Sequence, residues 1–176
     1  RVDPSKRQED VIKTLYYYQR RCNPKSRLFL VGAHTPGGLY HAWIEALIDH
    51  LGLRADVHFT GQVSHRDLLA FFHLADVFVC MSEHEGFCVP IVESMYLGIP
   101  VVAYQSTAIP FTLGDAGILF KKKDFAVMAE TVHQVTCDQK LRASLVAKGR
   151  ERAGYFSRGR VESILADYIG DLLHVG

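Results

Sequence analysis

The sequence of 176 residues predicts an α/β domain built on an open, doubly wound parallel sheet. Short, continuous apolar runs recur along the chain without polar alternation, which is typical of strands buried on both faces. Longer segments with apolar residues at helical spacing lie between these runs. Because parallel strands need crossover connections of this kind, the alternation predicts a Rossmann-like sheet with helices on both faces.

Five strands and seven helices follow from this pattern. The strands are expected at residues 28–31, 57–60, 77–81, 101–104 and 117–120. The helices are expected over about 8–20, 40–51, 64–72, 90–97, 125–135, 140–152 and from 157 onward. Ser64 and Asp124 are placed to cap the starts of two helices, and Gly52 to end another. Residues 1–6 and 105–116 are expected to be loops, and 121–123, a run of three lysines, a solvated turn.

Composition narrows the classes of function. Apolar residues make up 48% of the chain and charged residues 22%, with a net charge of +1. A chain this close to neutral lacks the basic field that holds nucleic acid, so no nucleic-acid partner is expected. No apolar run reaches the roughly 20 residues of a membrane span, and no signal peptide is visible. The four cysteines show neither CxxC nor zinc spacing, so we expect reduced thiols and a cytoplasmic protein.

The stretch 82–93 carries the strongest functional signal. It follows the most apolar predicted strand, and Pro90 is placed in the first turn of the next helix. Glu85 therefore lies in the loop and Glu93 about one turn into the helix. Each carboxylate can accept hydrogen bonds from a vicinal diol, and the backbone N–H groups between them approach a helix N-terminus that favours anions. A diphosphate that links two sugar rings would match this arrangement.

Simpler interpretations of the same residues remain open. Glu93 can be an acid favoured by the helix dipole, and Glu85 a solvated loop acid. Arg1 and Lys6 flank a loop at the same sheet edge and could offset diphosphate charge, or they could belong to a solvated chain end. The sequence contains no HExxH, Asp-x-Asp, GxSxG, GxxxxGK[ST] or GxGxxG pattern, so no metal, P-loop or dinucleotide site is expected.

The chain resembles the C-terminal, donor-binding domain of GT-B glycosyltransferases of the retaining family 4 group. The resemblance is carried by Glu85-Gly86-Phe87 through Glu93, which matches the E-x7-E motif of that family. It is supported by the segments 98–103 and 114–120, and by Arg1 and Lys6 at the positions of the family's arginine and lysine.

The resemblance implies a role for each site residue. The catalytic group would be Arg1 and Lys6, which stabilise the diphosphate leaving group, and Glu85, which binds donor-sugar hydroxyls. Glu93 would hold the ribose, and Val63 would contact the nucleobase through its backbone. The backbone amides that would assist Glu85 belong to Gly86, Phe87, Cys88 and Val89. The partner would be a UDP- or GDP-type nucleotide sugar, with no cofactor and no metal.

The resemblance also implies how residues 1–176 are used. They would form one donor-binding domain, a fragment of a longer two-domain enzyme that moves a hexose to an acceptor held by an N-terminal domain. The isolated domain would transfer nothing, and any membrane contact would lie in the other half. Cys88 stands where the family usually has glycine, and Ile109-Pro110-Phe111 lacks an acid often found there. A non-catalytic nucleotide-sugar-binding module and a GT-B-type epimerase are the alternatives.

Overall fold

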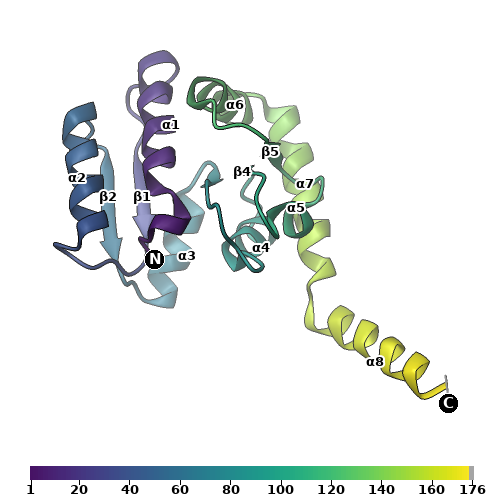
Figure 1. The fold of residues 1–176 in the computed structure, drawn as a ribbon. Helices are drawn as coiled ribbons and strands as arrows, with labels where there is room; N and C mark the ends of the chain where they lie inside the picture. The colour runs from purple at the N-terminus through teal and green to yellow at the C-terminus, as the bar shows by residue number, and fades with distance from the viewer. Residues whose placement is uncertain (175–176) are drawn as a thin grey trace.

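The computed structural model describes residues 1–174, with side-chain surroundings up to residue 166. Its strands and helices alternate along the chain (Figure 1). In order they are η1 (Pro4–Lys6), α1 (Gln8–Arg21), β1 (Leu28–Val31), α2 (Leu39–Leu51), β2 (Val57–Gly61), α3 (His65–Leu74), β3 (Phe78–Cys80), α4 (Val89–Tyr96), β4 (Val101–Tyr104), α5 (Ile109–Leu113), β5 (Ile118–Phe120), α6 (Phe125–Cys137), α7 (Gln139–Tyr155) and α8 (Arg158–His174). The predicted alternation of strands and helices is confirmed.

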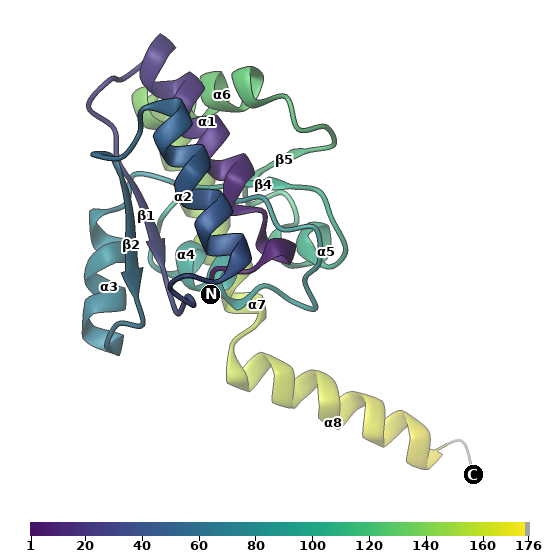
Figure 2. The same ribbon diagram turned by 60° about the vertical axis from the view of Figure 1, so that its left-hand side comes forward.

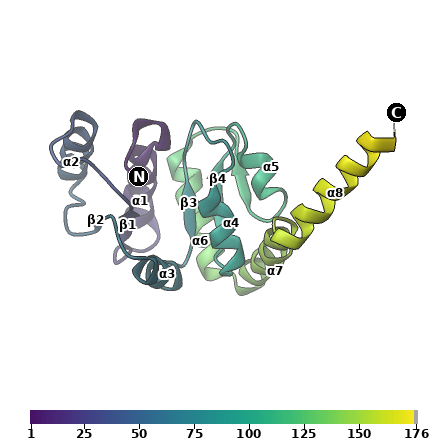
Figure 3. The same cartoon turned by 90° about the horizontal axis from the view of Figure 1, so that it is seen from below.

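All strand pairs in the described residues are parallel, as predicted, but they form two separate sheets. Strand β1 pairs with β2, and β3, β4 and β5 form a second sheet in that order. Viewed from below, β1 and β2 lie with α2 in one half, and β3 and β4 lie with α4 and α6 in the other (Figure 3). No strand of the described chain joins β1 to β3.

Helices cover both faces, which confirms the doubly wound arrangement. On β4, Val101 and Ala103 pack against α4, whereas Val102 between them packs against α6. Helix α1 connects the two halves, because Ile12 packs with α2 and β1 while Tyr18 packs with β4 and α6. Successive residues of β4 thus pack against helices on opposite faces of the sheet, as expected for a strand buried on both sides.

The predicted helix ends follow from local chemistry. The Ser64 hydroxyl accepts from the Asp67 N–H, and the Asp124 carboxylate accepts from two N–H groups of α6. Gly52 ends α2 in the left-handed conformation, with φ of 71°. These three predictions are confirmed.

Three local expectations were wrong. Residues 105–116 contain the short helix α5, whose five residues are too few to show helical periodicity. Residues 4–6 form the turn η1, which Asp3 caps by accepting from the Ser5 N–H. Lys123 is not a solvated residue of a turn, because its side chain is only 15% exposed.

Helix α8 leaves the body of the domain (Figures 1 and 2). Its apolar pattern predicted a helix correctly, but Val161 and Leu165 on it are about half exposed. No helix in the described part of the chain combines the length and apolar character needed to cross a membrane.

Candidate functional site

The stretch 82–93 turns sharply between β3 and α4. Ser82 is buried at the end of the strand, and Pro90 occupies the first turn of α4, as predicted. Cys88, immediately before the helix, has a φ of 67° and a ψ of 65°. A left-handed conformation is costly for a residue with a side chain, so the surrounding contacts must hold this turn in place.

Lys6 and Glu85 form an ion pair at this turn. The Lys6 Nζ lies 2.7 Å from Glu85 Oε1. The Glu85 side chain is 10% exposed, so it is not the solvated loop acid of the simpler interpretation. A backbone hydrogen bond from the Glu83 N–H to the Ser5 carbonyl fixes the same two segments together. The structure therefore brings two of the predicted site residues together from distant parts of the chain.

The ion pair sets the charge state of Glu85. Burial acts to raise the pKa of this carboxyl group. Hydrogen bonds from Lys6 and Ser82 and the positive charge of Lys6 act in the other direction and prevail, so the pKa lies below its usual value. Glu85 is consequently ionised near neutral pH and suits hydrogen-bond acceptance rather than proton donation.

The loop after β4 supports Glu85 from the other side. The Thr107 hydroxyl accepts from the Glu85 N–H and donates to the Glu85 carbonyl, at 2.9 Å in each case. Ser106 Oγ donates to the Ser82 carbonyl at 2.6 Å, and the Thr112 hydroxyl donates to the Phe87 carbonyl. Sequence reasoning missed these three hydroxyl residues. Their only signal was a concentration of Ser and Thr after a strand at the ligand edge.

The loop directly before α4 contains backbone N–H groups that have no acceptor in the described part of the chain. Within the described residues, no acceptor receives the backbone N–H of Gly86, Phe87 or Cys88. Gly86 is exposed and an added Cβ there would meet nothing within 4 Å, so the loop is open at this point. Unpartnered N–H groups beside a helix N-terminus favour an anion.

The remaining predicted residues lie around one groove. Arg1, Lys6, Val63, Glu85 and Glu93 all line a groove of about 800 Å³. Glu93 is half-buried, and the described residues offer its carboxylate neither a hydrogen bond nor an ion pair. The Arg1 side chain is exposed and lies 3.2 Å from Asp3. Cys88 lines the groove as well, whereas Gly86, Phe87 and Val89 do not. The roles of all these residues toward a ligand stay predictions.

A pair of thiols lies beneath the turn. Cys80 Sγ and Cys88 Sγ are both buried and 3.9 Å apart. Hydrogen bonding between them lowers the pKa of Cys80 to about 7 and raises the pKa of Cys88. The two sulfurs and a Glu85 oxygen lie within 4.8 Å of one another, so these three side chains could hold a cation, and two thiolates would favour a soft metal such as zinc.

A second network of ion pairs connects the loop that carries the site to α1. Lys123 Nζ lies 2.8 Å from Asp10 Oδ2 and 2.7 Å from Glu83 Oε1. Asp10 is buried at the start of α1, where Arg7 also contacts it at 3.1 Å. The network joins α1, the site loop and the end of β5, and nothing in the local sequence distinguishes Lys123 from its two lysine neighbours.

Two curated mannosyltransferases are similar to this chain in part of their sequences. The O-antigen chain mannosyltransferase B of Escherichia coli is 31% identical over 122 residues, which are 67% of this chain and 32% of that protein. A GDP-mannose-dependent alpha-(1-6)-phosphatidylinositol monomannoside mannosyltransferase of Mycolicibacterium smegmatis is 29% identical over 162 residues, 87% of this chain and 41% of that protein. The chain therefore spans less than half the length of either relative.

Solved structures share its fold. Anabaena HepE, in a complex with UDP and glucose, superposes with a TM-score of 0.83 at 24% identity, over 97% of this chain and 46% of that one. The C-terminal domain of the glycosyl transferase group 1 family protein LpcC of Francisella tularensis gives a TM-score of 0.75 at 23% identity, over 88% of this chain and 81% of that one. These likenesses confirm the expected fold, that of the C-terminal domain of GT-B glycosyltransferases.

The sequence pattern of the family described as glycosyl transferases group 1 matches residues 1–152. That span contains β1 to β5, the whole 82–93 stretch, Arg1 and Lys6. Together with the shared fold, the match shows that this chain belongs to the glycosyl transferases group 1 family.

Proposed function

We propose that residues 1–176 are the donor-binding half of a retaining, metal-independent transferase that moves a hexose from a nucleotide diphosphate sugar. The observation that carries the proposal is how the predicted site residues are arranged along one groove. Lys6 and Glu85 form a fixed pair there, Glu93 lines the same groove, and the chain between the two acids carries N–H groups with no acceptor among the described residues. These residues offer one carboxylate for the donor sugar, one for the ribose, and a positive region for the phosphates between them.

The donor-binding half would contribute to the reaction mainly by electrostatic stabilisation. When the bond between sugar and diphosphate breaks, negative charge builds on the departing phosphate. Lys6, Arg1 and the N-terminus of α4 would stabilise that charge, with Lys6 already fixed by Glu85. Glu85 would accept from hydroxyls of the transferred sugar and Glu93 from those of the ribose. Val63, on the loop after β2, would contact the base through its backbone.

Two relatives suggest which donor to test first. Both are mannosyltransferases, and one depends on GDP-mannose, whereas a structural neighbour was solved with UDP and glucose. We infer a GDP- or UDP-linked hexose as donor, with GDP-mannose as the first probe. The acceptor would be held by an additional domain of the full-length protein, opposite the groove mouth.

Titration calorimetry with GDP-mannose, UDP-glucose and the two free nucleoside diphosphates tests the proposal, on the full-length protein and on residues 1–176. Glu93→Gln should weaken both nucleotide sugar and nucleoside diphosphate about 10- to 100-fold, the worth of one charge-assisted hydrogen bond. Glu85→Gln should weaken the nucleotide sugar by a similar factor but leave the free diphosphate nearly unchanged.

Glu151→Gln, an exposed acid on α7, is the control and should bind as the unaltered chain does. Lack of binding of every nucleotide sugar to the full-length protein would overturn the proposal. Equal effects of Glu85→Gln on diphosphate and nucleotide sugar would overturn the assignment of Glu85 to the sugar ring. Product anomers, read by NMR from the full-length enzyme, test the retention of configuration.

A further inference from the structure

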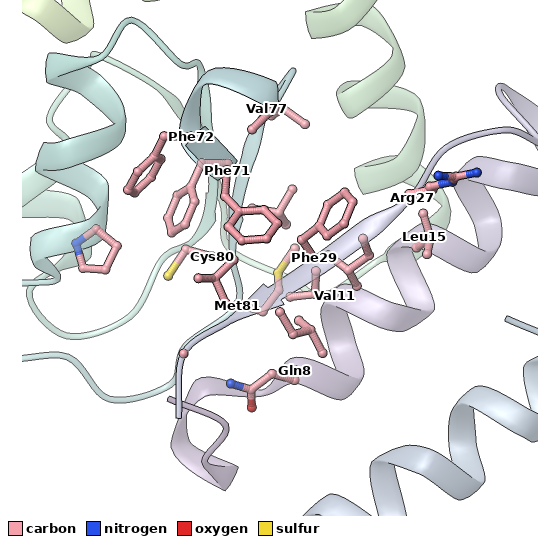
Figure 4. Close-up of a pocket in the computed structure, with 18 of the residues that line it drawn as sticks. Gln8, Val11, Leu15, Arg27, Phe29, Phe71, Phe72, Val77, Cys80 and Met81 are labelled. Carbon is pink, nitrogen blue, oxygen red and sulfur yellow. The ribbon is translucent and has the colours of Figure 1, made fainter. Parts of the chain in front are cut away.

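Three possible metal ligands lie close together in the sequence, around the turn before α4. Cys80 is the last residue of β3, Cys88 directly precedes α4, and Glu85 lies in the loop between them. Their Cys-x4-Glu-x2-Cys spacing matches none of the usual zinc patterns, so the sequence alone does not reveal them. All three line the groove, and Figure 4 draws Cys80, with its sulfur in yellow, among the side chains of its wall. The groove therefore gives an ion from solvent a route to all three side chains.

The separation of the two sulfurs fits a metal ion better than a disulfide. Cys80 Sγ and Cys88 Sγ are 3.9 Å apart. Zinc binds a thiolate at about 2.3 Å with tetrahedral geometry, which places two sulfur ligands about 3.8 Å from each other. A disulfide bond is only about 2.05 Å long, so its formation would require the sulfurs to approach by about 2 Å more. The observed distance is thus that of two ligands of one ion.

Glu85 is placed to be the third ligand. One of its carboxylate oxygens lies within 4.8 Å of both sulfurs. Tetrahedral coordination needs about 3.6 Å between a carboxylate oxygen and each thiolate, so only a small rotation of the side chain is required. Because a carboxylate has two oxygens, Glu85 can keep its hydrogen bond from Lys6 on one and bind the ion with the other.

The charges around such an ion would cancel. Cys80 is 6% exposed, Cys88 is 7% exposed and the Glu85 side chain is 10% exposed, and charges in such buried positions need compensation. Two thiolates and one carboxylate carry three negative charges. A divalent ion and the ammonium group of Lys6 carry three positive ones. The two thiol protons would leave to solvent as the metal binds.

Contacts on both sides hold the loop between the ligands in place. The Thr107 hydroxyl bonds both the N–H and the carbonyl of Glu85, and Ser106 Oγ donates to the Ser82 carbonyl. Cys88 keeps a φ of 67°, although a side chain makes the left-handed conformation costly. A strained backbone that the surrounding structure maintains is typical of functional sites. The ligand cluster is therefore formed before any ion arrives.

We propose that Cys80, Cys88 and Glu85 form a binding site for a zinc-like divalent cation, with water in a fourth position open to the groove. Two thiolates select zinc or cadmium over magnesium, which prefers oxygen ligands. The ion would take no part in sugar transfer and would instead occupy the carboxylate of Glu85. Any effect of the ion on the donor rests on the proposed function, whereas the binding of the ion itself does not.

Titration of the full-length protein with Co²⁺ and Zn²⁺ tests the site, with a phosphine reductant present and nucleotide sugar absent. Co²⁺ held by thiolates should show charge-transfer absorption in the near ultraviolet and the visible bands of a tetrahedral ion, and Zn²⁺ should displace it. Cys88→Gly, which suits the left-handed turn, and Cys80→Ala should each weaken Zn²⁺ at least about 100-fold. Loss of a group that merely supports a metal ligand already costs about 10- to 100-fold. Glu85→Gln should weaken Zn²⁺ at least about tenfold.

Cys22→Ser and Cys137→Ser are the matched controls, because both thiols lie outside the site, and each should change the affinity less than about twofold. Circular dichroism establishes that each variant is folded, and if Cys80→Ala is not, Cys88→Gly carries the comparison. Thiolate absorption that is absent from the unaltered protein, or unchanged in Cys88→Gly, would overturn the proposal. So would its loss in either control variant, or displacement of Co²⁺ by an equal concentration of Mg²⁺, since the ligands would then be different groups.

Discussion

The ammonium group of Lys6 lies 2.7 Å from the carboxylate of Glu85, although 79 positions separate them in sequence. The pair joins the turn η1 to the loop before α4, the two segments to which the sequence assigned phosphate and sugar binding. It keeps a buried acid ionised and places a positive charge beside it. The same contact is therefore structural in the free chain and available to a ligand.

Replacing Lys6 should reveal this structural role through pH. Lys6→Gln should lower the free energy of unfolding by about 1–3 kcal/mol at pH 7, because Glu85 loses its charged partner in a nearly buried position. In the unaltered chain the pKa of Glu85 lies below the usual value for a glutamate. The pair therefore stabilises the fold above that usual pKa, and its contribution is lost as pH falls through the lowered pKa. The deficit of the variant should therefore shrink toward pH 4.

Urea unfolding between pH 4 and pH 7 measures this effect. Lys148→Gln is the matched control, because Lys148 pairs with the exposed carboxylate of Asp115 at 2.9 Å. An exposed pair contributes at most about 1 kcal/mol. A Lys6→Gln deficit that is independent of pH would contradict the assigned role.

Lys123 should matter far more than the adjacent Lys122. Lys123→Gln removes one partner from Asp10, which is buried, and one from Glu83, so we expect a loss of about 1–3 kcal/mol in unfolding free energy. Lys122→Gln changes an exposed residue and should stay within about 0.5 kcal/mol. Denaturant curves for the two variants measure the difference, and similar values would argue against the ion network.

Cys88 should prefer glycine to alanine as its replacement. Its φ of 67° is in the left-handed region, where a Cβ costs roughly 1–2 kcal/mol. Both Cys88→Gly and Cys88→Ala remove the contact with Cys80, so their comparison isolates the backbone conformation. Thermal unfolding should place Cys88→Gly about 1 kcal/mol above Cys88→Ala, and the reverse order would show that the turn is not held left-handed.

Metal should compete with the donor rather than assist it. We expect the affinity for nucleotide sugar to change less than about twofold between excess chelator and added Mg²⁺. Added Zn²⁺ should weaken donor binding, because an ion held by Cys80, Cys88 and Glu85 would occupy the carboxylate that is proposed to bind the sugar. Cys88→Ala should reduce the effect of zinc. Calorimetry checks each case, and affinity lost on chelation would refute metal independence.

Local features of the sequence predicted the fold well. Apolar runs located all five strands, and caps at Ser64, Asp124 and Gly52 located helix ends, because each depends on residues close together in the chain. The spacing of Glu85 and Glu93 around Pro90 also gave the correct strand-turn-helix placement.

Contacts between distant segments could not be predicted in the same way. Lys123 and Asp10 are 113 positions apart, and Thr107 reaches Glu85 over 22, so neither contact leaves a periodic signal. The division into two sheets could not be predicted either, because it depends on which strand edges pair with one another. An apolar run specifies a strand but not its neighbour.

The double hydrogen bond between Thr107 and Glu85 has a consequence for engineering. One hydroxyl, that of Thr107, bonds both the N–H and the carbonyl of Glu85. The backbone position of Glu85, and with it the direction of its carboxylate, therefore depends on the segment after β4. Exchanging residues 105–108 between relatives would re-aim Glu85 without altering any group proposed to touch the donor. Sugar preference could then be selected from a library confined to four positions outside the binding surface.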